Sequence, residues 1–224
     1  MIPAPAPLFP LPLVLFPGQM RTLRIFEPRY RALLDHCLAL EQPFGILLSR
    51  PATRAQPEPL PHRVGTLAHI TEVQRLSDDT FALRVYGRER FRVDSFLLDK
   101  PYLQGRIQLL SMLAAESAEA HALHPQMMHR LRAYVEALSQ ASGLQFGIVA
   151  YPPEPLELAF LTALALQINN EEKQALLAAT HLPTLMRREL QLLHSELDLM
   201  AWIMATLPEA SARSFGPSGA LHPN

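Results

Sequence analysis

The sequence predicts an α+β protein in which a barrel of short strands with one inserted helix precedes a bundle of α-helices. In the first half, short apolar segments alternate with turn-forming residues, which favours a barrel over a parallel sheet. In the second half, apolar residues recur every three or four positions, as in helices buried on one side. We therefore expect a barrel in residues 1–112, helices in 113–207 and a disordered tail in 208–224.

The composition indicates a chain with a core and little net charge. Its 224 residues are 49% hydrophobic, which excludes disorder throughout. Twenty Lys and Arg side chains against 21 Asp and Glu give a net charge of −1, so no bulk attraction to nucleic acid or anionic lipid is expected. The one cysteine, Cys37, excludes an internal disulfide and any site with several cysteine ligands.

The N-terminal segment lacks the features of a signal peptide. Its first basic residue is Arg21, and four prolines in the first ten residues prevent the helix that a signal peptide needs. The most apolar helical run, 156–168, is much shorter than the ~20 residues that span a bilayer. We expect a cytoplasmic protein without a membrane span.

The expected barrel begins with an apolar segment, 8–16, whose prolines place it at a sheet edge. A strand over 21–25 follows, and Pro28 then suits the first position of a helix whose apolar stripe includes Cys37. The proline-rich segment 49–63 is expected to be a long loop. Further strands are predicted at 44–48, 64–75, 81–93 and 104–110.

The second half contains four predicted helices. Pro125 is well placed to start the first, 156–168 forms the second, and the pair Asn169-Asn170 caps a third over 171–179. Thr184 is expected to cap the last helix, which carries a heptad seam. This seam either packs onto the chain's own helices or forms a weak homodimer; its residues are Met186, Leu190, Leu193, Leu197, Met200, Met204 and Leu207.

No motif in the sequence indicates a catalytic nucleophile or base. Lys100 lies at a turn and Lys173 at a charged helix start, so neither is expected to have the depressed pKa of a catalytic lysine. Cys37 on its buried stripe is typical of a structural cysteine. We expect no catalytic residue.

Three histidines have spacings that resemble a metal site. They are His121, His124 and His129, but Pro125 is expected to separate the third from the others, and Glu119 is the nearest carboxylate. A polar helix boundary is the simpler interpretation. We expect neither a metal nor a cofactor.

The strand over 81–93 carries a row of basic side chains. If it is extended, Leu83, Val85, Phe91 and Val93 point to one side, and the other side presents Arg84, Tyr86, Arg88, Arg90 and Arg92. Such a face either keeps an exposed sheet soluble, contacts a protein, or binds nucleic acid with Tyr86 stacking on a base. Gly87 can introduce a bulge.

Several motifs resemble the N-terminal substrate-binding domain of Lon proteases. The first pair is the Phe-Pro-Gly at 16–18 with the Phe-Glu-Pro-Arg-Tyr at 26–30. Gly-Thr-Leu-Ala-His-Ile at 65–70 and Gly-Arg-Glu-Arg-Phe-Arg-Val at 87–93 follow in the family's order. The resemblance covers about residues 8–207, and it implies a PUA-like barrel followed by helices.

The resemblance also implies recognition of unfolded or tagged polypeptides, with a protease or chaperone as a partner. Lon proteases carry ATPase and Ser–Lys protease modules that this sequence does not match, so we expect a non-enzymatic binding module. Binding is expected beside the 49–63 loop, in a cleft between the two subdomains, or by strand addition at the proline-containing edge. The candidate binding residues are Tyr86, Arg88, Arg90, Phe44 and Leu60.

Two other functions remain open from the sequence alone. One is an RNA-binding PUA-like protein that uses the arginine-rich strand 84–92. The other is an enzyme whose pocket is lined by Tyr86, His69 and Glu72.

Overall fold

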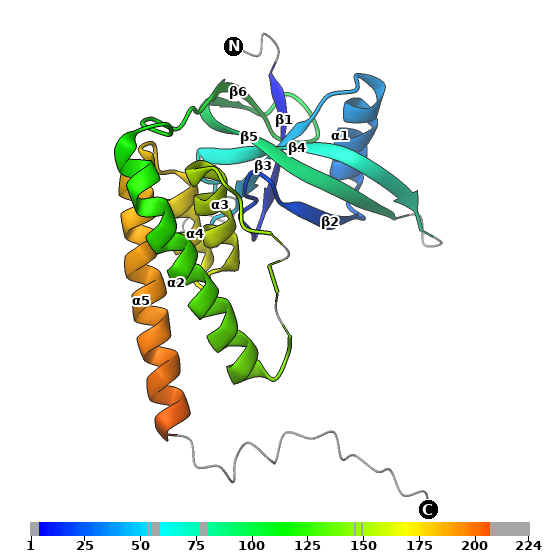
Figure 1. Cartoon of the computed structure of the whole chain (residues 1–224). Coiled ribbons are helices and arrows are strands. Elements are labelled where there is room, and N and C mark those ends of the chain that lie inside the picture. Colours follow the sequence, from blue (N-terminus) through cyan, green and yellow to red (C-terminus); the bar gives the residue numbers. More distant parts are fainter. Residues whose placement is uncertain are drawn as a thin grey trace, which may run out of the picture.

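The computed structural model describes residues 5–52, 54, 59–76, 80–145, 147–148 and 150–206. Figure 1 shows a β-rich part with one helix against it, from which two long helices, α2 and α5, extend side by side. The strands are β1 (Ala6–Leu11), β2 (Met20–Ile25), β3 (Phe44–Leu48), β4 (Val64–Arg75), β5 (Phe81–Leu97) and β6 (Gln104–Leu109). The helices are α1 (Pro28–Ala39), α2 (Ala118–Ser142), α3 (Pro155–Ala165), α4 (Asn170–Leu177) and α5 (Leu182–Thr206).

The six strands form one mixed sheet that returns to its own start. Neighbours follow the order β2-β5-β4-β3-β1-β6, and β6 also pairs with β5. The ladder of β5, β4, β3, β1 and β6 therefore ends on β5 again, and only β2 has one described neighbour. The prediction that the proline-containing strand forms the edge is wrong, because β1 lies between β3 and β6. Its ladders are short, with four residue pairs to β3 and two to β6, so the prolines interrupt few bonds.

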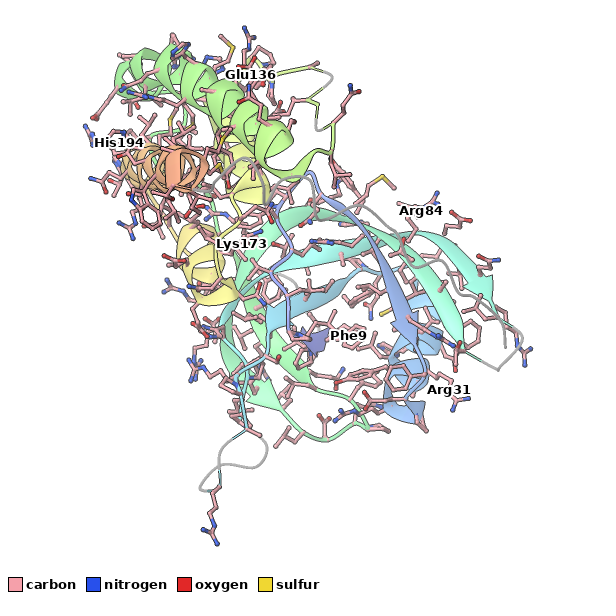
Figure 2. All side chains as sticks on the ribbon, turned by 90° about the horizontal axis from the view of Figure 1, so that it is seen from below. Phe9, Arg31, Arg84, Glu136, Lys173 and His194 are labelled. Carbon is pink, nitrogen blue, oxygen red and sulfur yellow. The ribbon has the colours of Figure 1, made fainter. Side chains whose placement is uncertain are left out.

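Helix α1 follows its sequence pattern closely. Pro28 occupies the start of the helix, where its missing N–H removes no hydrogen bond. The buried stripe consists of Tyr30, Leu33, Leu34 and Cys37. These side chains share one core with Phe9, Phe44 and the inner residues of β5, and Figure 2 shows Phe9 inside this β-rich part.

Two helix starts differ from the sequence prediction. Helix α2 begins at Ala118, because the Ser117 side chain caps it by accepting from the Ala120 N–H at 3.2 Å, and Pro125 lies inside the helix. Helix α5 begins at Leu182, so Thr184 is a helical residue and not a cap. The predicted cap of α4 is confirmed, since the Asn169 side chain accepts from the Glu172 N–H at 2.9 Å.

The heptad seam of α5 packs within the chain for most of its length. Met186, Leu190, Leu193, Leu197 and Met200 all belong to the helical core. Met204 is 49% exposed, and Leu207 lies outside the described residues. The predicted homodimer through this seam therefore stays a prediction that concerns only the far end of α5.

The helical core also includes side chains of the β-rich part, among them Phe16, Leu48 and Val64. The two parts are therefore packed against each other. No described helix combines the length and the low polarity that crossing a bilayer requires. The predicted disordered tail, 208–224, lies outside the described residues, as does part of the 49–63 loop.

Candidate functional site: a groove between β5 and helix α3

A groove of about 740 Å³ separates the β-rich part from the helical part. Its first wall is β5 from Tyr86 to Arg90, together with the turn at Pro17 and Gly18. The segment from Leu109 to Met112, which follows β6, forms a second wall. The outer face of α3, from Leu156 to Leu164, forms the third. Four stretches of the sequence thus build one concave surface, as is common for binding sites.

Gly87 brings the turn and β5 into direct contact at this groove. The Gly18 N–H donates to the Gly87 carbonyl at 2.9 Å, and the Gly87 N–H donates to the Gln19 carbonyl at 2.9 Å. A Cβ atom at position 87 would lie 2.5 Å from the Phe16 carbonyl oxygen, so only glycine permits this approach. The pairing of β4 with β5 also shifts register beside Gly87, as the glycine suggested.

The Arg90 side chain joins the two parts at the back of the groove. It is 3% exposed, and its guanidinium donates to the carbonyls of Leu177, at 2.7 Å, and Ala179. These carbonyls lie at the C-terminal end of α4, where the helix dipole favours a cation. The guanidinium also lies 5.5 Å from the centre of the Phe160 ring on α3. Burial lowers the pKa of Arg90 from its ordinary value.

The expectation that five residues of β5 share an exposed face is therefore wrong at Arg90. Arg84, Tyr86, Arg88 and Arg92 are exposed, but α3 and α4 cover Arg90. A strand's alternation shows which side a residue faces, whereas the helices that cover that side come from much later in the chain. Arg90 positions the groove wall and does not present a charge to solvent.

Carboxylates lie near two of the other basic side chains on this face, Arg84 and Arg88. Arg84, which Figure 2 shows on the outer side of the sheet, pairs with Glu72 at 2.9 Å. Arg88 lies 4.0 Å from Glu89, which also contacts the His69 imidazole at 3.3 Å. The strand therefore does not offer a row of unpaired cations to a phosphate backbone, and the RNA-binding alternative gains no support.

The three residues of the alternative enzyme pocket do not converge. His69 lies opposite Tyr86 in the β4–β5 ladder, but its imidazole contacts Glu89. Glu72 pairs with Arg84, and neither His69 nor Glu72 lines the groove. Burial also raises the pKa of Cys37 to about 12, so its thiol stays protonated at neutral pH.

The candidate binding residues do not all lie at the groove, although Arg90 lines it as a buried residue. Tyr86, which is 37% exposed, and Arg88 line the groove. Leu60 is 46% exposed but lies outside the groove lining. Phe44 is fully buried, with its ring centre 6.0 Å from that of Phe9, so it cannot contact a ligand as the sequence interpretation expected. Its strand, β3, lies in the middle of the sheet.

Sequence reasoning missed the apolar residues of the groove. Leu109 is 51% exposed at the end of β6, and Leu156 and Leu161 are half-buried on α3. The pattern of α3 indicates burial on most sides, and the groove is the side left uncovered. No signal in the sequence marks these residues, because the exposure of Leu109 depends on how distant segments pack.

Comparison with known proteins places the chain in a family. The model of the ATP-dependent protease La (LON) substrate-binding domain matches residues 5–195. The chain is 28% identical to Lon protease 2 of Myxococcus xanthus and 28% identical to Lon protease of Anaeromyxobacter dehalogenans. Each match covers 89% of this chain but 24% of the relative, so the chain spans about a quarter of those proteins' length.

Two solved structures share the fold. The N-terminal domain of the Mycobacterium avium complex Lon protease superposes with a TM-score of 0.61, at 16% identity, over 85% of this chain and 98% of that one. The Lon N-terminal domain protein from Xanthomonas campestris gives 0.52 at 22% identity, over 92% of this chain and 99% of that one. The matched segments include the β-rich part and most of the helical part. The chain thus belongs to the family of Lon substrate-binding domains.

Proposed function

We propose that this chain binds unfolded or tagged polypeptides in the groove between β5 and α3, without chemistry of its own, and delivers them to a protease. The observation that carries the proposal is the groove itself, an uncovered apolar face of α3 opposite Tyr86 and Leu109. The family membership supports a substrate-binding role. Folded proteins bury such apolar segments, so a groove of this kind selects chains that have lost their fold.

The distribution of charge in the groove supports a tolerant binding mode. Glu89, Glu157 and Arg88 are exposed along it, so both signs of charge are present beside apolar surface. A surface of mixed charge does not select strongly by the charge of the polypeptide. Affinity is then expected to come from apolar side chains and to change little with salt.

The open edge of the sheet extends this binding surface. Met20 on β2 pairs with Tyr86 and is 54% exposed, and β2 has no second neighbour among the described strands. An extended chain leaving the groove past Tyr86 would reach unpaired backbone groups of β2. Main-chain hydrogen bonds at a sheet edge are tolerant of sequence. We therefore propose that strand addition occurs at β2 and not at the proline-containing strand.

We further propose that residues 1–112 form a PUA-like barrel and that 113–207 form a second subdomain. The strand ladder that returns to β5 supports the barrel. Two clusters of buried residues belong to the β-rich part alone, and a third belongs mostly to the helices. The location in the cytoplasm stays a prediction.

The direct test is fluorescence anisotropy of a labelled, permanently unfolded polypeptide titrated with the protein at low and high salt. We expect weak binding that tolerates salt, that structured RNA does not displace, and that the folded form of the same polypeptide does not show. Binding to RNA alone, lost at high salt, would contradict the proposal.

Variants locate the binding surface. Leu109→Ser and Tyr86→Ser each remove an exposed apolar side chain from the groove, and we expect each to weaken binding about fivefold to tenfold. Leu98→Ser is the matched control, because Leu98 is 78% exposed and lies outside the groove. Equal losses in all three variants would show that binding occurs elsewhere.

A further inference from the structure

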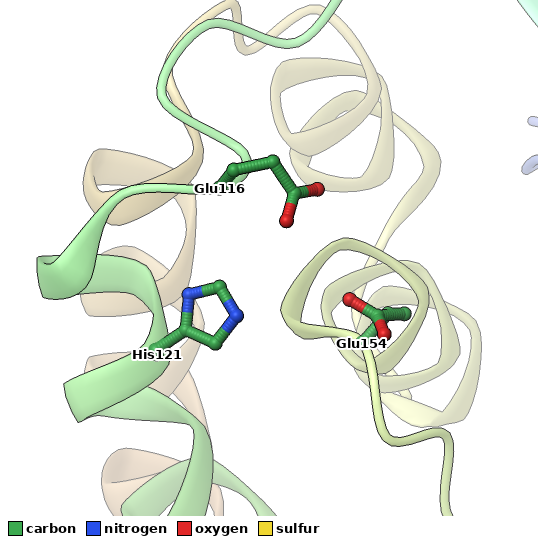
Figure 3. A group of neighbouring side chains, drawn as sticks. All are labelled: Glu116, His121 and Glu154. Carbon is green, nitrogen blue, oxygen red and sulfur yellow. The ribbon is translucent and has the colours of Figure 1, made fainter.

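Three side chains able to hold a metal converge beside the connection between α2 and α3. Glu116 directly precedes the cap of α2, His121 lies in the first turn of α2, and Glu154 occupies the N-cap position of α3 without a side-chain capping bond. One ligand atom from each lies within 4.8 Å of the other two. Figure 3 shows the His121 ring turned toward the space between the two carboxylates. Two separate elements therefore supply one nitrogen and two oxygen donors to the same point.

The His121 ring is held in the form that a metal requires. Its Nδ1 lies 3.0 Å from the Ser117 carbonyl oxygen, which can only accept a hydrogen bond. Nδ1 therefore carries the proton in the neutral ring, and the lone pair of Nε2 is left for a cation. A backbone carbonyl that fixes the ring in this way is the usual outer partner of a metal-binding histidine.

In the described part of the chain, no arginine or lysine pairs with either carboxylate. The ion pairs found there involve neither Glu116 nor Glu154, and both side chains are exposed. The positive ends of α2 and α3 favour one carboxylate each. The two carboxylates and the imidazole together direct three donor atoms to one point.

We propose that Glu116, His121 and Glu154 bind one divalent transition-metal ion, with Zn²⁺ as the best match. Zinc accepts imidazole nitrogen together with carboxylate oxygen, and it uses four ligands, so that water completes the set. Magnesium instead prefers oxygen ligands in an octahedral arrangement and is expected to bind far more weakly. The three histidines of α2 do not share a site, because the His124 Nε2 lies 2.9 Å from the Pro152 carbonyl oxygen.

The bound ion would tie the start of α3 to the start of α2. The chain between these helices includes Pro152, which lines the groove. A metal ion that links Glu154 to α2 would hold the chain in place two residues after Pro152. The ion would therefore stabilise one wall of the groove, and metal binding would raise the melting temperature of the protein.

The test is a calorimetric titration of the full chain with Zn²⁺ and, separately, with Mg²⁺. We expect one Zn²⁺ per chain with micromolar affinity, weaker binding of Mg²⁺, and a higher melting temperature that a chelator reverses. His121→Ala and Glu154→Gln should each weaken Zn²⁺ binding at least about tenfold. The control is His129→Ala, which removes an exposed histidine of the same helix outside the cluster and should leave binding unchanged.

The substituted side chains are exposed, so the variants are expected to fold, and their far-ultraviolet circular dichroism verifies this. Absence of Zn²⁺ binding to the unmodified protein at millimolar concentrations would overturn the proposal. So would binding that survives both His121→Ala and Glu154→Gln, since that would place the ion at other histidines. Neither result bears on polypeptide binding, which the anisotropy experiment measures without metal.

Discussion

The two ends of helix α5 lie in opposite environments. Toward the sheet, Met186, Glu189 and Leu193 are fully buried in a core that also takes side chains from the β-rich part. Toward the far end, apolar side chains face solvent: Leu199, Trp202, Ile203 and Met204. The apolar side chains of α5 thus pack inside the molecule at one end of the helix and face solvent at the other. The difference arises because the short helices and the sheet surround only the near end (Figure 1).

Polar side chains also bond helix α4 to the β-rich part. Arg90 binds carbonyls at the end of α4, and the Gln174 side chain donates to the Val64 carbonyl at 3.0 Å. At the other end of α4, Asn170 donates to the Pro12 carbonyl at 2.8 Å. Helix α4 is therefore bonded to the β-rich part along its whole length. Hydrogen bonds between buried groups fix the position of one element relative to another more strictly than apolar packing alone does.

Arg90→Met should have the largest effect on stability. The substitution keeps much of the side-chain volume but leaves the carbonyls of Leu177 and Ala179 without their charged donor. We expect the free energy of unfolding to fall by roughly 3 kcal/mol, measured by urea denaturation. Arg92→Met, an exposed change on the same strand, is the control and should cost less than about 0.5 kcal/mol. Equal losses would mean that the bonds from Arg90 to the Leu177 and Ala179 carbonyls contribute nothing particular to stability.

Glu189→Met should increase stability. Both Glu189 carboxyl oxygens are buried without a hydrogen-bond partner, and burial raises the pKa of this group well above its ordinary value. Replacing the carboxyl by an apolar group of similar size is expected to add about 1 to 3 kcal/mol at pH 7. The exposed Glu136 provides the control, since Glu136→Met should change stability by less than about 0.5 kcal/mol.

The pH dependence gives an independent measurement at the same residue. In the folded chain burial raises the pKa of Glu189, so this group holds its proton to a higher pH than in the unfolded chain, where it loses the proton above a pH near 4.5. The unfolded state therefore binds fewer protons, and the contribution of Glu189 to stability falls as the pH rises. The stability gained by Glu189→Met should thus be smallest near pH 4 and grow toward pH 8. A gain that does not change with pH would contradict the raised pKa.

Trp202→Ser should have the smallest effect, because Trp202 is 64% exposed at the far end. We expect a loss below about 0.5 kcal/mol. Trp202 is also the one tryptophan of the chain, so its fluorescence reports on this end alone. Emission typical of indole in water is expected in dilute solution. A blue shift that grows with protein concentration would show that a second copy covers the far end, as the homodimer prediction requires.

Local patterns in the sequence predicted much of the secondary structure. The spacing of Tyr30, Leu33 and Cys37 defines the buried side of α1, and Asn169 caps α4, because both features depend on neighbours within one or two turns. The helix start predicted at Pro125 was wrong, because this prediction used only the local preference of proline for helix starts. Ser117, eight residues earlier, caps the helix.

Such local patterns could not predict the groove or the bonds between Arg90 and the end of α4. The alternation of β5 places Arg90 correctly on the outer face, but only α3 and α4, some 70 to 90 residues later, decide that it is buried. Leu109 and Leu161 line one surface, but the local sequence around neither residue predicts this. Sites assembled from distant segments depend on tertiary packing, which periodicity does not encode.

The position of β1 between β3 and β6 has a consequence for how the chain acquires its fold. Its pairing with β3 joins residues about 37 positions apart, such as Leu8 and Gly45, whereas Ala6 meets Gly105 only after about a hundred residues have been made. The ladder therefore cannot close during early synthesis, and Arg90 must wait longer still, until Leu177 and Ala179 have emerged. Contacts between such distant residues carry a large loop-closure entropy and slow folding. The β-rich part can therefore close its ladder once Gly105 has been made, and its bonds to α4 form later, after Leu177 and Ala179 have been made.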